Sequence, residues 1–86
     1  MRRAMQLLTL LVTSYEMLTS AYEKKTNLTD ANIQDFRQLG DRIGTTLTRM
    51  AGEPDIATHW SEFQFQKRLF EETKGRFDHF LTIRES

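Results

Sequence analysis

The chain has 86 residues, of which 12 are basic and 12 acidic, with one proline, four glycines and no cysteine. This length fits a single domain, residues 1–86, near the lower size limit for a self-sufficient core. The lack of cysteine excludes disulfide bonds and thiolate metal sites, and a formal net charge of zero lacks the basic excess on which nucleic-acid affinity usually depends. Packing of apolar side chains must therefore stabilise the fold, within one chain or across a dimer.

The start of the chain loosely imitates a secretory leader, because a basic pair, Arg2 and Arg3, precedes an apolar run. The uninterrupted apolar run is short, residues 10–12, and Glu16 falls where a cleavage site would lie. A membrane span would need about 20 apolar residues. We therefore expect a soluble, cytoplasmic protein with no membrane segment.

A first amphipathic helix is predicted over about residues 2–24, because apolar residues recur at alternating intervals of three and four. At about 100° per residue, Leu10 and Met17 project away from the main apolar stripe. The stripe residues expected in the core are Leu8, Leu11, Tyr15 and Leu18.

A second helix is predicted over about residues 30–51, after the polar cluster "KKTNLTD". Thr29 is suited to the N-cap, and Asp30 to the positive end of the helix dipole. Leu28 before the cap and Ile33 within the helix can form a hydrophobic staple. This helix has one apolar face, and its predicted core residues are Ile33, Phe36, Gly40, Ile43 and Leu47.

Two glycines, Gly40 and Gly44, lie one turn apart inside this second helix. Each costs about 1 kcal/mol relative to alanine, so something other than helix propensity must favour them. Both project toward the buried side, where they form a shallow notch. We expect an aromatic ring from a neighbouring helix to fill it, and the candidates are Tyr15, Trp60, Phe63 and Phe70.

A third, long helix is predicted over about residues 55–83, after Gly52 in a left-handed C-terminal position and Pro54 in the first turn. Gly75 could divide it. Its main stripe, expected in the core, comprises Trp60, Phe63, Phe70 and Phe77. Roughly opposite lies a second apolar set, comprising Phe65, Leu69, Phe80 and Ile83.

These patterns predict an all-α fold, an antiparallel three-helix bundle or hairpin with a long third helix. A lone three-helix bundle buries one sector of each helix, yet the first and third helices carry two apolar sectors. Exposed apolar patches mark interaction sites. We therefore expect a homodimer, another protein partner, or both, with these partner-binding residues: Leu10, Met17, Phe65, Leu69, Phe80 and Ile83.

Candidate chemistry is sparse. Asp55, His59 and Glu62 have spacings that could converge on a divalent metal, but no matching pair occurs on the other helices. Lys67 and Lys74 interrupt the aromatic stripe of the third helix, where their stems can pack while the ammonium groups reach water. We expect no metal, no cofactor, no small-molecule substrate and no enzymatic activity.

The sequence thus predicts a small non-enzymatic protein-interaction module: an adaptor, inhibitor, secretion chaperone or regulator. The alternative is a dimeric DNA-binding regulator, in which residues 41–64 form a helix-turn-helix with its turn at 52–54. Against DNA binding, Glu53, Asp55 and Glu62 lie where a recognition helix would meet phosphates.

Overall fold

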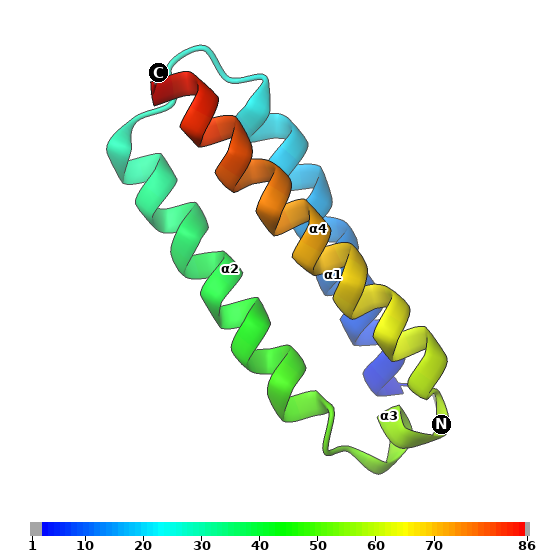
Figure 1. The fold of residues 1–86 in the computed structure, drawn as a ribbon. Helices are drawn as coiled ribbons and strands as arrows, with labels where there is room; N and C mark the ends of the chain where they lie inside the picture. The colour runs from blue at the N-terminus through cyan, green and yellow to red at the C-terminus, as the bar shows by residue number, and fades with distance from the viewer. Residues whose placement is uncertain (1–2, 86) are drawn as a thin grey trace.

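The computed structural model describes residues 3–85, which form four helices and contain no strand (Figure 1). The helices are α1 (Arg3–Glu23), α2 (Asp30–Met50), α3 (Pro54–Thr58) and α4 (Trp60–Glu85). Three long helices lie along one axis of a molecule measuring 44 × 18 × 17 Å, and α2 runs opposite to α1 and α4 (Figure 1). The all-α prediction is confirmed, with four helices packing together in place of three. Residue 2, the expected start of the first helix, lies outside the described residues.

Helix α2 begins where the capping pattern predicts. The Asn32 backbone N–H donates to Thr29 Oγ1 at 3.1 Å, and the Thr29 N–H donates to Asn32 Oδ1 at 3.3 Å. Asparagine therefore completes a reciprocal capping box in which glutamate or glutamine is the usual partner. Leu28, just before the cap, is buried, and Ile33 is half-buried against the same core.

The end of α2 differs from the prediction, because no glycine within residues 3–85 has a positive φ. The Gly52 N–H donates to the Arg49 carbonyl at 3.2 Å, so the right-handed turn continues past the helix end. Glu53 then reverses the chain in an extended conformation, with φ −78° and ψ 137°. The left-handed position expected at Gly52 is therefore wrong.

The predicted long third helix is divided, but at His59 and not at Gly75. His59 has φ −119° and ψ 43°, which separates the short α3 from α4. Helix α3 is held against the start of α1, where Asp55 Oδ2 accepts a hydrogen bond from the Ala4 N–H at 3.1 Å and Ile56 is fully buried. The chain must turn after these contacts before α4 can run beside α1. Helix α4 then continues unbroken through Gly75.

The core lies between α1 and the facing sides of α2 and α4. Tyr15 stacks on Phe36 of α2 with ring centroids 5.0 Å apart and lies 5.0 Å from Phe70 of α4. Phe36 meets Phe77 edge-on at 4.6 Å. Of the predicted core, these residues are buried: Leu8, Tyr15, Phe36, Gly40, Ile43, Leu47, Phe63, Phe70 and Phe77. Leu11 and Ile33 are half-buried at its edge.

Leu18 was expected in the core but is 43% exposed. The buried sector of α1 is centred on Met5, Val12 and Thr19, which lies to one side of the predicted stripe. Thr19 can occupy this sector because its hydroxyl donates to the Tyr15 carbonyl at 2.8 Å, which satisfies the buried polar group. Burial of a threonine thus rotates α1 away from the orientation that hydropathy predicts.

Trp60 was also expected in the core but is 45% exposed. It is the first residue of α4, directly after the break at His59. Its ring stacks on the buried Phe63 with a centroid separation of 5.1 Å, so it covers the core from outside. The break between α3 and α4 places it there.

The glycine notch on α2 is filled by two aromatic rings. A Cβ built on Gly40 would lie 3.2 Å from the Tyr15 hydroxyl oxygen, and one built on Gly44 would lie 3.9 Å from Phe70 Cε2. The predicted aromatic socket is therefore present, with Tyr15 and Phe70 as its occupants. The bare backbone at Gly40 lets the Tyr15 ring approach α2 closely.

Candidate protein-interaction surface

Large exposed apolar side chains are confined to α1 and α4 within the described residues. Leu10 and Met17 of α1, and Phe65 and Ile83 of α4, are each 61–69% exposed. Helix α2, in contrast, exposes no large apolar residue. Water therefore contacts large apolar side chains mainly on α1 and α4.

Contacts between α1 and α4 set the register of the two helices, which run in the same direction (Figure 1). Tyr15 lies beside Phe70, and Arg76 Nε donates to Glu23 Oε2 at 3.2 Å. This register places Leu10 level with Phe65, and Met17 level with residues 70–72. We call the shared surface the α1/α4 face, and define it by Leu10, Met17, Phe65, Leu69, Phe80 and Ile83.

Leu69 and Phe80 are less exposed on this face than predicted. Both are half-buried and pack against the core, and the Phe80 ring centroid is 5.9 Å from that of Phe77. The buried sector of α4 extends toward them because Thr73 is buried, with its hydroxyl donating to the Leu69 carbonyl at 2.8 Å. Their expected place opposite the core is therefore corrected: they form the inner border of the face, and Phe65 and Ile83 form its outer part.

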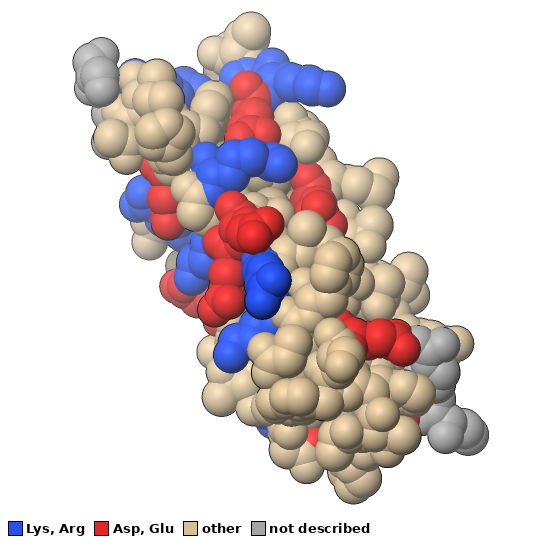
Figure 2. Space-filling model, turned by 45° about the vertical axis from the view of Figure 1, so that its right-hand side comes forward, with Lys and Arg blue, Asp and Glu red and all other residues tan. Residues whose placement is uncertain are grey.

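Two opposite charges, Glu72 and Arg76, lie on α4 between Phe65 and Ile83. Arg76 donates through Nε to Glu23 and through Nη2 to Ser20 Oγ at 3.5 Å, so it bridges α4 to α1. Figure 2 shows charged atoms of both signs gathered over part of the surface and a broad uncharged area at the end where α3 lies. Along α4, the α1/α4 face therefore carries Phe65 and Ile83 toward its two ends and the opposite charges of Glu72 and Arg76 between them.

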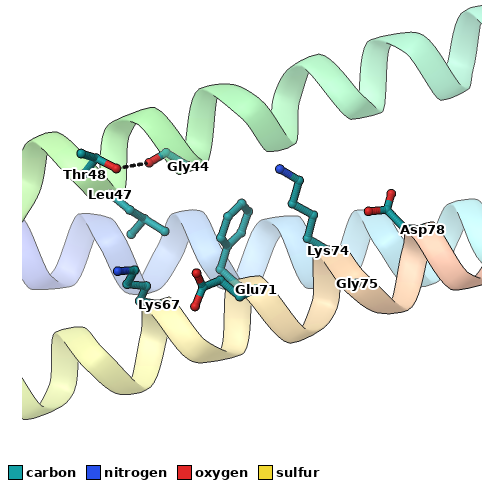
Figure 3. Close-up of a pocket in the computed structure, with 9 residues that line it drawn as sticks. Gly44, Leu47, Thr48, Lys67, Glu71, Lys74, Gly75 and Asp78 are labelled. Carbon is teal, nitrogen blue, oxygen red and sulfur yellow. Dashed lines mark hydrogen bonds between the residues drawn. The ribbon is translucent and has the colours of Figure 1, made fainter.

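A groove of about 450 Å³ lies between α2 and α4, on a different side of the molecule (Figure 3). Leu47 and Phe70 line its apolar part, while Lys67, Glu71, Lys74 and Asp78 provide its charges. Lys74 extends toward α2 (Figure 3), and its Nζ lies 3.4 Å from Asp41 Oδ1. The two ammonium groups thus face at least as many carboxylates, which leaves no excess positive charge for an anionic ligand.

Near this groove, the Tyr15 hydroxyl has a pKa that differs from its ordinary value. Burial, followed by the nearby carboxylates of Asp78 and Asp41, raises the pKa of Tyr15 to about 12. The hydroxyl consequently keeps its proton at neutral pH and is a poor base or nucleophile there.

Of the three candidate metal ligands, Asp55 is bonded elsewhere, and His59 and Glu62 lie beside each other. Asp55 accepts the Ala4 N–H, and His59 Nδ1 lies 3.7 Å from Glu62 Oε1. Across residues 3–85, no group of three or more histidine or carboxylate side chains is arranged to hold a metal ion. Within the same range, no helix has the length and apolar character needed to cross a membrane.

Sequence reasoning missed the exposure of Leu7, Leu18 and Trp60, which enlarge the apolar surface of α1 and α4. The sign that Leu18 would be exposed was its neighbour Thr19, four residues after the core residue Tyr15. A threonine hydroxyl can bond to the carbonyl of the preceding turn, which allows the threonine to be buried.

No protein-family model, no curated protein and no solved structure matches the chain. The geometry of the molecule is therefore the basis for assigning a function.

Proposed function

We propose that this protein is a small non-enzymatic interaction module that binds protein through the α1/α4 face. The observation that carries the proposal is the exposure of Leu10, Met17, Phe65 and Ile83, each 61–69%, on the two parallel helices α1 and α4 of a small domain. Burying such side chains is favourable by about 25 cal/mol per Å² of apolar surface, and aromatic residues often dominate interfaces. A partner that covers this face would remove these four apolar side chains from water.

The finer architecture that we propose is an antiparallel three-helix bundle within a homodimer, with α3 forming part of the connection between α2 and α4. Such a unit presents two rigid helices side by side, which costs little ordering entropy on binding. An adaptor, inhibitor, secretion chaperone or regulator would all use the surface in this way. The non-enzymatic part of the proposal is supported by the protonated Tyr15 and the balanced charges of the α2/α4 groove.

Protein binding is better supported than the DNA-binding alternative. A recognition helix after the turn at residues 52–54 would be α3, which has five residues and carries Asp55 in its first turn. The next helix begins at Trp60 and has Glu62 in its first turn. These carboxylates repel phosphate. A DNA-binding protein would show an affinity for duplex DNA that falls steeply with salt concentration.

The test introduces charge at one apolar end of the face, using the double variant Leu10→Glu and Phe65→Glu. We expect it to lose self-association in analytical ultracentrifugation, or to lose a partner that is captured by the wild type and identified by mass spectrometry. Far-UV circular dichroism should stay unchanged, because both side chains are already largely in water.

The matched control is Gln38→Glu with Thr45→Glu, which adds the same charge to exposed positions on α2. Binding that survives in the α1/α4 double variant as well as in the control would overturn the proposed function. Unfolding of the double variant would show that Leu10 and Phe65 belong to the core, which would also overturn it.

A further inference from the structure

One line of residues along α4 follows the spacing of a coiled-coil seam. From Phe65 to Ile83 its members are four, three, four, three and four residues apart, which is a 3.5-residue repeat. The seam consists of Phe65, Leu69, Glu72, Arg76, His79 and Ile83. Such a repeat keeps one line of side chains directed at a partner helix over several turns.

Four of the six seam residues are complementary when the seam is reversed, and the remaining two, Leu69 and His79, are placed opposite each other. Phe65 and Ile83 lie equally far on either side of residue 74, and so do Glu72 and Arg76. A two-fold axis through this midpoint would therefore bring an apolar residue against an apolar residue, and an acid against a base, twice each. Self-complementary patches are the requirement for a closed, isologous dimer.

We propose that a second copy of this chain covers the α1/α4 face, with the two α4 helices antiparallel and centred on residue 74. Glu72 pairs with Arg76 of the partner subunit, and Phe65 packs against Ile83 of the partner subunit. The inference rests on the proposed function, because it assumes that this face binds protein, and it adds the identity and orientation of the partner.

Arg76 has the capacity for the additional contact. Its guanidinium carries five N–H donors, of which the observed contacts use Nε toward Glu23 and Nη2 toward Ser20. Its side chain is 49% exposed. Donors on Nη1 therefore remain for Glu72 of the partner subunit.

Helix α1 extends the same interface. Leu10 lies level with Phe65, so the partner's Ile83 would meet an apolar surface from both helices. Met17 lies level with residues 70–72, near the charged centre, where its flexible side chain can cover the stems of the paired residues. Two α1/α4 pairs would then bury their exposed apolar residues in one shared layer.

A parallel arrangement of the two α4 helices does not satisfy the same residues. It would oppose Glu72 with Glu72 and Arg76 with Arg76 of the second copy, and like charges across an interface weaken association. An unrelated partner helix would not require the seam to be symmetric about its midpoint. The arrangement of charges therefore favours a second copy in the antiparallel orientation.

The first experiment exchanges the charges one at a time, with Glu72→Arg in one protein and Arg76→Glu in another. Each variant alone places like charges in both central pairs, so we expect its dimer dissociation constant to rise about tenfold. An equimolar mixture restores both attractive pairs and should give a heterodimer in native mass spectrometry. Wild-type affinity in both single variants would overturn the proposed register.

The second experiment uses cross-linking, for which the cysteine-free chain provides a clean background. Positions 65 and 83 lie about 27 Å apart along one helix. In the antiparallel dimer position 65 faces position 83, so two chains that both carry Phe65→Cys, or both carry Ile83→Cys, hold their cysteines too far apart for a disulfide. Their mixture should give a covalent heterodimer under oxidation. A mixture of Phe65→Cys with Gln38→Cys, on α2, is the control for random collision.

Other outcomes separate this inference from the function on which it rests. A disulfide-linked homodimer of Phe65→Cys alone would indicate parallel helices and overturn the orientation. A wild type that stays monomeric at about 100 µM would overturn the self-association, since a functional homodimer with a Kd well below this value would be detected. In that case the capture experiment with Leu10→Glu and Phe65→Glu still decides whether the face binds another protein.

Discussion

Replacing Gly40 with leucine tests whether the glycine is required by its aromatic neighbour. Leucine is a better helix former than glycine by about 0.8–1 kcal/mol, so local propensity alone predicts a more stable protein. The structure predicts the opposite. A Cβ at this position would lie 3.2 Å from the Tyr15 hydroxyl oxygen, and the remaining leucine atoms would enter the space that the Tyr15 ring occupies.

The expected magnitude follows from two opposing contributions. Overpacking a well-packed site costs about 1–3 kcal/mol, because neighbouring side chains leave their preferred rotamers. The gain in helix propensity offsets about 1 kcal/mol of this cost. We therefore expect the free energy of unfolding of Gly40→Leu to fall by about 1 kcal/mol, with an upper value of about 2 kcal/mol. Tyr15 cannot easily withdraw, since Phe36 and Phe70 pack against its ring.

Two glycines in the same fold provide controls for the Gly40 variant. A Cβ at Gly44 would lie 3.9 Å from Phe70, which is an ordinary van der Waals contact, and a Cβ at Gly75 would meet no atom within 4 Å. Gly44→Ala and Gly75→Ala should each raise the free energy of unfolding by up to about 1 kcal/mol. Urea denaturation followed by circular dichroism, at one protein concentration, measures all three. A Gly40→Leu protein more stable than the wild type would refute the close packing of Tyr15 on α2.

Two further predictions concern Tyr15 and the start of α2. Because the pKa of Tyr15 is about 12 in the folded protein and about 10 in the unfolded chain, its contribution to stability is complete below pH 10 and is lost as the pH rises toward 12. The wild type should thus lose about 2 kcal/mol more than Tyr15→Phe over this range in urea denaturation, and equal losses would show that the raised pKa is wrong. Thr29→Ala, which removes the hydroxyl of the capping box, should lower the free energy of unfolding by about 1 kcal/mol, whereas Thr26→Ala in the same loop should change it little. Equal effects of the two threonine variants in thermal denaturation would contradict the cap.

Features of the fold that depend on nearby residues could be predicted from the sequence. The start of α2 is set by Thr29 and its neighbours within one turn, so the capping pattern identified it. The glycine notch was predictable for a similar reason: Gly40 and Gly44 share the apolar side of a single helix, and only a large ring can fill the space that they leave.

The break at His59 could not be predicted, because its cause is distant in the sequence. Asp55 bonds to the backbone of Ala4, 51 residues earlier, and this contact holds α3 at an angle from which the chain must turn. The exposure of Trp60 follows from that turn. Local patterns carry no information about such a contact, since apolar spacing is compatible with one continuous helix.

The candidate surface was predicted in part for a related reason. Helical projection identified Leu10, Met17, Phe65 and Ile83 as residues away from the core, and the structure exposes all four. It failed for Leu69 and Phe80, because it could not foresee that Thr73 is buried and widens the core sector of α4. Hydropathy treats threonine as polar, yet a hydroxyl bonded to the preceding turn can be buried at little cost. Whether the surface binds a partner stays a prediction.

The net charge of the chain and the position of its apolar residues both favour a dimer with one defined orientation. A net charge near zero provides little long-range repulsion between copies, and so permits close approach. Charged residues nevertheless lie at the centre of the α1/α4 face, where Glu72 and Arg76, followed by the polar His79, interrupt the apolar line. Charges at an interface contribute more to specificity than to affinity, because a misaligned partner leaves them unpaired. The apolar residues at the ends of the face can thus provide the affinity of a dimer, while the central pair selects one orientation among the many that apolar contact alone would allow.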